Sequence, residues 1–144
     1  MLRITKKAEY GIIALKHMLH KPIGSVTRAR EIAEAYRIPS EIMAKILQEL
    51  TRKGIIESCQ GAKGGYILAK QGSEISLAEI VEALEGPLGI VECVSDVNCN
   101  CTQFDTCNIS DPFQIIQKQF KIFLAKISLE AISNEMEMQR VAWH

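Results

Sequence analysis

Apolar residues recur every three or four positions in the first fifty residues, and short polar stretches interrupt them. A helix is predicted over residues 8–20, and Thr5 can cap its start. One face of this helix collects Ala8, Ile12, Leu15 and Leu19. After the break KPIGS, Thr27 is placed to cap a short second helix that carries Ile32, Ala33 and Tyr36.

A third helix is predicted over residues 40–52, because Pro39 suits a first helical turn and Gly54 can end the helix in a left-handed conformation. Its expected buried stripe comprises Ile42, Met43, Ile46, Leu47 and Leu50. The stretches IIES and YIL follow, separated by CQGAKGG, whose three glycines predict the tip of a β-hairpin. Three helices and a hairpin in this order are typical of a winged helix-turn-helix, whose third helix lies in the DNA major groove.

Two more helices are predicted in the second half. ISLAEIVEALEG has Ser76 as its cap and Glu79 three residues on, and Gly86 with Pro87 stops it. A last helix is expected from Pro112 to about Met138. Its heptad seam is Phe113, Ile116, Phe120, Phe123 and Ile127, and a second stripe is Ile115, Ile122 and Leu129. So wide an apolar face predicts pairing with a second copy of the helix, with a core helix of a single chain as the alternative.

Length and composition narrow the class of protein. The chain has 144 residues, which suits one domain with an arm, and no apolar run reaches the ~18 residues that span a bilayer. The start MLRITKKAEYG lacks the apolar core of a signal peptide, so a cytoplasmic protein without membrane contact is expected. No nucleophile–base pairing or phosphate-binding signature is present, so we do not expect an enzyme.

The net charge of zero divides into a basic and an acidic half. Residues 1–72 hold 13 Lys and Arg against 6 Asp and Glu, a net charge of +7, and residues 73–144 hold 4 against 11, a net charge of −7. The basic half is expected to meet a polyanion, here double-stranded DNA, with solvated surface charge as the alternative.

The exposed face of the third helix and the hairpin tip supply the candidate DNA contacts. Ser40 and Glu41 are the candidates for base edges, whereas Lys45 and Arg52 are expected to hold phosphates. The remaining candidates are Ala44, Gln48, Gln60 and Lys63.

Four of the five cysteines lie within one polar stretch, with the spacing Cys93-x5-Cys99-x-Cys101-x5-Cys107. Structural zinc sites usually have two close cysteine pairs, and only one close pair occurs here. Several thiolates spread over one loop better suit an iron–sulfur cluster. Reduced cytosolic thiols make structural disulfides less expected, while zinc and a bare thiol switch remain alternatives. Cys59 is expected to be a small packing residue of the hairpin.

These motifs together resemble the Rrf-two family of bacterial winged-helix regulators, which includes cluster-binding repressors of iron–sulfur assembly, iron homeostasis and nitric-oxide stress. RITKKAEYGIIAL resembles the family's first helix, IPSEIMAKILQELTRKGIIES its recognition helix and first wing strand, and GAKGGYILA its wing. The resemblance covers nearly the whole chain. It implies a mainly α (α+β) fold: a winged helix-turn-helix with a β-hairpin wing, a cysteine loop and a long C-terminal dimerisation helix.

The resemblance also implies a homodimer on a palindromic operator and a [2Fe–2S] or [4Fe–4S] cluster whose state alters DNA affinity. The implied ligands are Cys93, Cys107 and either or both of Cys99 and Cys101. The expected division is a DNA-binding domain over 1–72, a helix and cluster loop over 73–111, and a dimerisation helix and tail over 112–144.

Three features depart from the family pattern. Both Cys99 and Cys101 are present where the family usually has three cysteines in all, which leaves open a fully cysteine-ligated cluster. Ser110 stands where some members have a histidine ligand; other members use a carboxylate from the first helix of the partner subunit, and Glu9 of the partner subunit occupies that place, with a surface carboxylate near the helix start as the alternative. Gln60 replaces an arginine just before the wing's first glycine, which removes a charge suited to the minor groove. The alternative functions are a winged-helix regulator with zinc or a thiol switch, and an interaction module without DNA binding.

Overall fold

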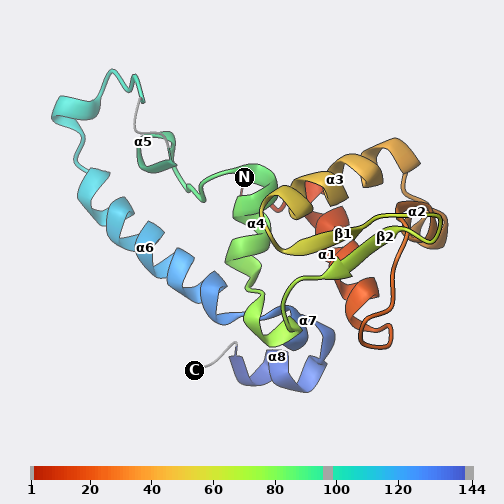
Figure 1. Ribbon diagram of the computed structural model, residues 1–144. Helices are drawn as coiled ribbons and strands as arrows, with labels where there is room; N and C mark the ends of the chain where they lie inside the picture. The colour runs from red at the N-terminus through yellow and green to blue at the C-terminus, as the bar shows by residue number, and fades with distance from the viewer. Residues whose placement is uncertain (1, 96–98, 142–144) are drawn as a thin grey trace.

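Three helices and a β-hairpin form the body of the molecule, and a long helix extends from it (Figure 1). The computed structural model describes residues 2–95 and 99–141. The expected winged helix-turn-helix is confirmed. The elements in chain order are α1 (Lys6–Leu19), α2 (Ala29–Tyr36), α3 (Ser40–Arg52), β1 (Ile56–Cys59), β2 (Gly65–Leu68), η1 (Gly72–Glu74), α4 (Leu77–Glu85), α5 (Glu92–Ser95), η2 (Phe104–Thr106), α6 (Ser110–Lys126), α7 (Leu129–Ser133) and α8 (Glu135–Val141).

The core lies where α1, α3 and α4 pack together. Thr5 caps α1 as expected, because its Oγ1 accepts a hydrogen bond from the N–H of Ala8. From α3, four side chains at helical spacing are buried: Met43, Ile46, Leu47 and Leu50. Ile42 was expected among them but is 42% exposed. It precedes Met43 by one residue, about 100° around the helix, and so lies at the edge of the buried face.

The wing is a short antiparallel pair in which Ile56 lies opposite Leu68 and Cys59 opposite Gly65. Thr27 was predicted to cap α2, and this was wrong: Arg28 is the N-cap residue, and no side chain caps that end. Thr27 instead exchanges two backbone hydrogen bonds with Tyr66, at 2.9 and 2.8 Å. Glycine is required at position 65, since a Cβ there would lie 2.6 Å from the carbonyl oxygen of Thr27. The Thr27 backbone therefore pairs with the wing like a third strand. These two backbone hydrogen bonds stabilise the fold more than the side-chain cap of α2 that Thr27 could otherwise form.

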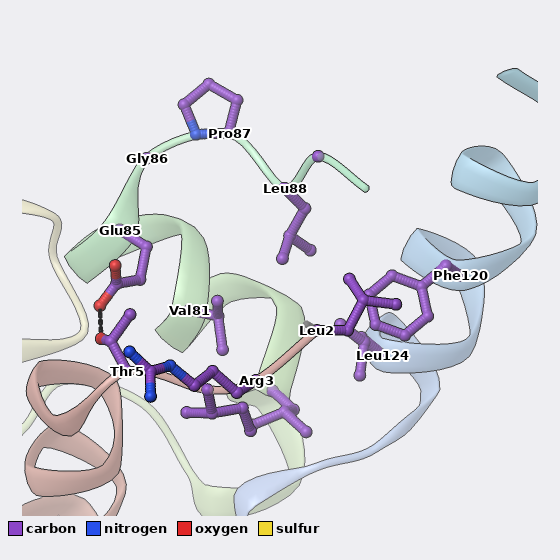
Figure 2. Close-up of a pocket in the computed structure, with 13 residues that line it drawn as sticks. Leu2, Arg3, Thr5, Val81, Glu85, Gly86, Pro87, Leu88, Phe120 and Leu124 are labelled. Atoms are coloured by element: carbon purple, nitrogen blue, oxygen red, sulfur yellow. Dashed lines mark hydrogen bonds between the residues drawn. The ribbon is translucent and has the colours of Figure 1, made fainter. Parts of the chain in front are cut away.

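α4 joins the winged helix to the rest of the chain. Ser76 caps it as predicted, accepting a hydrogen bond from the N–H of Glu79. At the other end Glu85 accepts a hydrogen bond from the Thr5 hydroxyl (Figure 2). Beside this contact, Leu2, Val81, Leu88, Phe120 and Leu124 line an apolar groove of about 450 Å³ between the N-terminal segment, α4 and α6.

The final helix was predicted to continue to about Met138, but α6 ends at Lys126. Ile127 is extended, and Ser128 caps a new helix, α7, by accepting from the N–H of Ala131. Ile127 and Leu129, expected on the dimer seam and its neighbouring stripe, are instead 4% and 0% exposed. Leu129 belongs to the main core cluster, and backbone hydrogen bonds from the N–H of Leu77 to Ile127 and from the N–H of Leu129 to Ile75 hold this segment against the start of α4. Burial of two large side chains thus ends the helix.

Leu129→Ala is expected to lower the free energy of unfolding by about 2–5 kcal/mol, because a fully buried leucine leaves a cavity. Urea unfolding of the purified protein measures this. Met136→Ala is the matched control, since Met136 is 71% exposed on α8 and should change stability by less than about 0.5 kcal/mol. Equal stability of the two variants would place Leu129 outside the core.

Candidate nucleic-acid interface and cysteine loop

The candidate DNA contacts of α3 lie on the side opposite its buried stripe. Ser40, Glu41, Lys45, Gln48 and Arg52 are exposed, and Ala44 is half-buried. Within residues 2–95 and 99–141, the ammonium group of Lys45 has no ion-pair partner. It is therefore available to a phosphate.

The wing tip lies beside α2, at the end of the molecule where α3 begins (Figure 1). Gln60 and Lys63 are both exposed there, and Gly61 adopts a left-handed φ of 107°. The structure thus brings the start of α3 and the wing tip to one end of the protein. Such an arrangement can place α3 in a major groove and the wing over the adjacent backbone.

Arg28 is a basic residue of this surface that the sequence did not reveal. Its Nη2 donates to the carbonyl oxygen of Ala62 at 3.0 Å, which ties the start of α2 to the wing tip 34 residues later. The side chain is exposed, and a guanidinium has five N–H donors, so donors remain for a phosphate. A cation therefore stands at the wing although Gln60 replaces the expected arginine.

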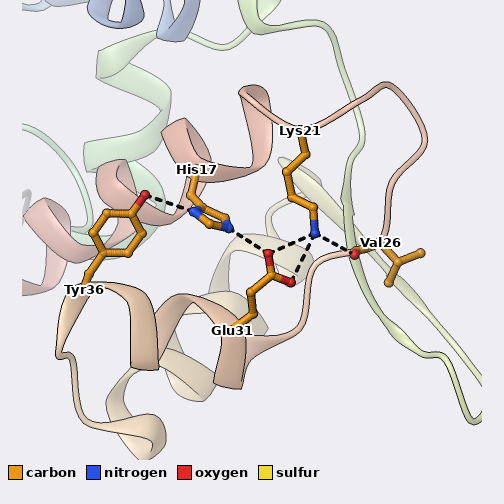
Figure 3. Close-up of polar contacts among 5 residues, drawn as sticks. All are labelled: His17, Lys21, Val26, Glu31 and Tyr36. Atoms are coloured by element: carbon orange, nitrogen blue, oxygen red, sulfur yellow. Dashed lines mark hydrogen bonds and ion pairs between the residues drawn. The ribbon is translucent and has the colours of Figure 1, made fainter.

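A polar network fixes α2 against α1 (Figure 3). His17 lies between Tyr36 and Glu31, with its Nδ1 2.9 Å from the Tyr36 hydroxyl and its Nε2 2.9 Å from Glu31 Oε1. Lys21 donates to the same carboxylate and to the carbonyl oxygen of Val26, just before the Thr27 edge of the wing. The hydrogen bond from His17, followed by Lys21, lowers the pKa of the Glu31 carboxyl. Glu31 thus stays ionised near neutral pH and ties α2 to α1 and to Lys21.

All four clustered cysteines line one open pocket of about 740 Å³. Cys93 comes from α5, Cys99 and Cys101 precede η2, and Cys107 follows it; each is a half-buried free thiol. Phe113, in the first turn of α6, forms part of the wall. No three His, Cys, Asp or Glu side chains in the described part of the chain are close enough to hold one metal ion. The four cysteines that are close in sequence thus also line one pocket, but the pocket is open and the thiols are not yet close enough to hold one metal ion.

Desolvation raises the pKa of the Cys99 thiol; a backbone hydrogen bond at Cys101 opposes this, and negative charge on Cys101, Cys93 or Glu92 raises the pKa further. Metal binding would displace the proton of each ligating thiol, because thiolates are the ligands. Glu9 does not line this pocket in its own protomer; it pairs with Lys6 at 2.6 Å.

The pocket and the wing tip lie on opposite sides of the molecule. Figure 1 shows the cysteine loop at the outer end of α6 and the wing at the other side of the body. The face of α6 between them keeps large apolar side chains in solvent: Ile115 (64% exposed), Ile116 (49%), Phe120 (37%), Ile122 (39%) and Phe123 (44%).

A family model described as "Rrf2: Iron-dependent Transcriptional regulator" matches residues 4–135. The chain belongs to the Rrf2 (Rrf-two) family. Rrf2 members are transcription regulators that bind DNA and usually act as dimers, and they are not enzymes. No helix in residues 2–95 and 99–141 of this Rrf2 chain is long and apolar enough to cross a membrane.

Relatives of this Rrf2 protein match over most of their length. Protein aau3 of Rhizobium meliloti (strain 1021) is 32% identical over 109 residues, which are 76% of this chain and 70% of that protein. Rv1287 of Mycobacterium tuberculosis, whose name describes an HTH-type transcriptional regulator, is 27% identical over 143 residues, or 98% of this chain and 87% of that protein.

Two solved structures of Rrf2 regulators share the fold. CymR (YrzC), the global cysteine regulator of B. subtilis, superposes with a TM-score of 0.72 at 24% identity, over 94% of this chain and 98% of CymR. T. potens IscR gives 0.61 at 22% identity, over 98% and 88% of the two chains. At these identities the likeness establishes the architecture alone.

Arg28→Gln is expected to weaken binding to all DNA sequences and to lower the slope of log affinity against log salt by about 1, because one phosphate contact is lost. Lys45→Ala should act in the same way. Titrations of duplex DNA at several salt concentrations measure the slope. Arg140→Ala, which removes an exposed cation from α8, is the control and should leave the slope unchanged. An unaltered slope for Arg28→Gln would remove Arg28 from the interface.

Proposed function

We propose that this Rrf2 protein is a homodimeric transcription regulator, acting as a repressor, whose operator affinity depends on an iron–sulfur cluster held by the cysteine loop. The observation that carries the proposal is the shared pocket: four thiols from one loop face the same open space. The family includes iron–sulfur regulators such as IscR, which agrees with this donor set. The cluster would supply a redox- and ligand-sensitive metal centre, either [2Fe–2S] or [4Fe–4S].

The residues present fit such a group. Cys93 and Cys107 line the pocket from the two ends of the loop's sequence, and Cys99 and Cys101, either or both of them ligands, line it from the middle of that sequence. A fully cysteine-ligated cluster is possible with this set. With three thiolates, the fourth ligand would be Glu9 of the partner subunit, and a carboxylate would make that site more labile because oxygen is a harder ligand than sulfur.

DNA recognition follows from the dimer. Two copies of α3 would enter successive major grooves of a palindromic operator, with Ser40 and Glu41 at base edges and Lys45 and Arg52 at phosphates. Lys63 and Gln60 would meet the backbone or minor groove beside each half-site. In this scheme residues 1–72 read DNA, residues 73–111 sense, and residues 112–144 supply the dimer contact and the α7–α8 tail.

A thiol switch is the second candidate function. All five cysteines are free thiols, and the structural neighbour CymR is named a cysteine regulator. In this case oxidation or modification of the loop thiols, rather than a cluster, would alter DNA affinity.

Iron and sulfide analysis of anaerobically purified protein, with a visible spectrum, separates the candidates. The proposal expects iron and acid-labile sulfide in stoichiometric amounts together with visible absorbance. DNA titrations with and without the cluster then measure its effect. Protein that contains zinc, or no metal, and binds DNA according to its thiol state would overturn the cluster proposal in favour of the second candidate.

A further inference from the structure

Gln117 is one of two buried polar side chains in the described part of the chain, the other being Thr27. It lies in α6 and is 8% exposed. A buried amide is stable only when its donor and acceptor are both satisfied. Its Oε1 accepts from the backbone N–H of Ile90 at 2.9 Å, and its Nε2 donates to the carbonyl oxygen of Leu88 at 2.5 Å.

These two hydrogen bonds hold the chain that leads into the cysteine loop. Leu88 and Ile90 lie between the end of α4 and Cys93, which is three residues after Ile90. The other end of the loop is fixed by the chain itself, because α6 begins at Ser110, three residues after Cys107. Gln117 stands about two turns further along the same helix. Both ends of the loop are therefore anchored on α6, one covalently and one through an amide.

The same face of α6 is attached to the winged helix. One turn after Gln117, Lys121 forms an ion pair with Glu82 of α4 at 2.7 Å. α4 in turn packs tightly on α1, where a Cβ at Gly11 would lie 2.3 Å from Leu84 Cδ1. A continuous set of packed and hydrogen-bonded groups thus runs from the loop through α6 and α4 to the DNA-binding elements.

We propose that Gln117 is a positioning residue for the cysteine loop. Its side chain holds Cys93 at a fixed position relative to Cys107 and links the loop to α6. Pre-organised ligands lose less freedom when they bind, so the clamp lengthens the lifetime of whatever the four thiols hold. It also makes α6 and α4 respond when the loop rearranges. The consequence for a cluster rests on the proposed function, whereas the clamp itself does not.

Gln117→Leu removes both hydrogen bonds and places an apolar side chain of similar size in the buried site. Gln117→Glu keeps an acceptor for Ile90 but loses the donor to Leu88, and serves as the intermediate variant. Gln119→Leu changes an exposed glutamine of the same helix and is the matched control. The whole 144-residue chain is used for every variant.

Amide hydrogen exchange of Ile90 in cluster-free protein tests the clamp directly. Exchange should be about 10-fold faster in Gln117→Leu than in the wild type, with a smaller increase in Gln117→Glu and none in Gln119→Leu. Equal exchange in wild type and Gln117→Leu would show that the clamp is not formed and would overturn the proposal. The exchange measurement does not depend on the cluster. If the wild type holds neither iron nor sulfide, the proposed cluster is rejected, but the clamp can still be tested.

Cluster lifetime and DNA affinity test the positioning role. After anaerobic reconstitution with iron and sulfide, a chelator should bleach the visible absorbance of Gln117→Leu about 10–100-fold faster than that of the wild type. The ratio of DNA affinities with and without the cluster should move towards 1, while the cluster-free affinity stays within about twofold of the wild type. The Ile90 amide of Gln117→Leu could exchange faster while its bleaching rate and its ratio of DNA affinities equal those of the wild type. Gln117 would then have a purely structural role, and the proposal would be overturned.

Discussion

Cys93→Ala and Cys107→Ala, made separately, are each expected to abolish the visible absorbance of the anaerobically prepared protein. Both thiols line the shared pocket, one at each end of the loop, and neither has a spare cysteine beside it. Loss of either cysteine would remove a metal ligand at one end of the loop, where the loop meets a helix. Absorption spectra with iron and sulfide analysis measure the loss.

The matched control is Cys59→Ala, because Cys59 is a free, half-buried thiol of β1 that lies outside the pocket. Its spectrum should equal that of the wild type. Cys99→Ala and Cys101→Ala should differ from each other if only one of them is a ligand, and Glu9→Ala should keep a cluster that bleaches faster if Glu9 is the fourth ligand. Full absorbance in the Cys93 and Cys107 variants would show that the loop is not the cluster site.

We expect a cluster at this place to act on DNA through the dimer, by way of α6. The loop lies at the outer end of α6, away from the wing of its own protomer (Figure 1). Its state would therefore change the angle or spacing of the two α3 helices, and half-site spacing is a strict geometric demand. Coupling of this kind typically amounts to about 5–150-fold in affinity. The Cys93 and Cys107 variants should bind the operator as the cluster-free wild type does.

Replacing Phe120 and Phe123 together by Glu is expected to give monomers. These rings are 37% and 44% exposed on α6, and two carboxylates would be buried without partners if the helices still paired. A monomer has only one winged helix to bind one half-site, so operator affinity should fall by about 10²–10⁴-fold. Analytical ultracentrifugation and operator titration measure the two effects.

Ile23→Glu is the control for this double variant. Ile23 is fully exposed in the loop after α1, so it tests whether an added carboxylate at an exposed apolar site alone affects assembly. It should remain a dimer. A dimer of full strength in the Phe120 and Phe123 variant would mean that the apolar face of α6 meets something other than a second copy.

The sequence alone predicted the elements whose signals are local. Thr5 and Ser76 cap α1 and α4 because a side-chain oxygen and an N–H three residues away meet in any helix that starts there. The stripe Met43, Ile46, Leu47 and Leu50 needed only the helical period, and the hairpin needed only its glycine-rich tip. The cysteine cluster was also visible, since its members are close in the chain and the loop gathers them into one pocket.

Only the tertiary structure decided the features that depend on partners distant in the chain. Thr27 pairs with Tyr66 instead of capping α2, and α6 ends at Lys126 because Ile127 and Leu129 are buried in the core. Arg28 reached Ala62 across 34 residues, and Gln117 reached Leu88 and Ile90 across 29 and 27. Capping contributes about 1 kcal/mol, whereas burial of one large apolar side chain contributes about 1.5–3 kcal/mol, so long-range packing overrides the local signal where the two compete.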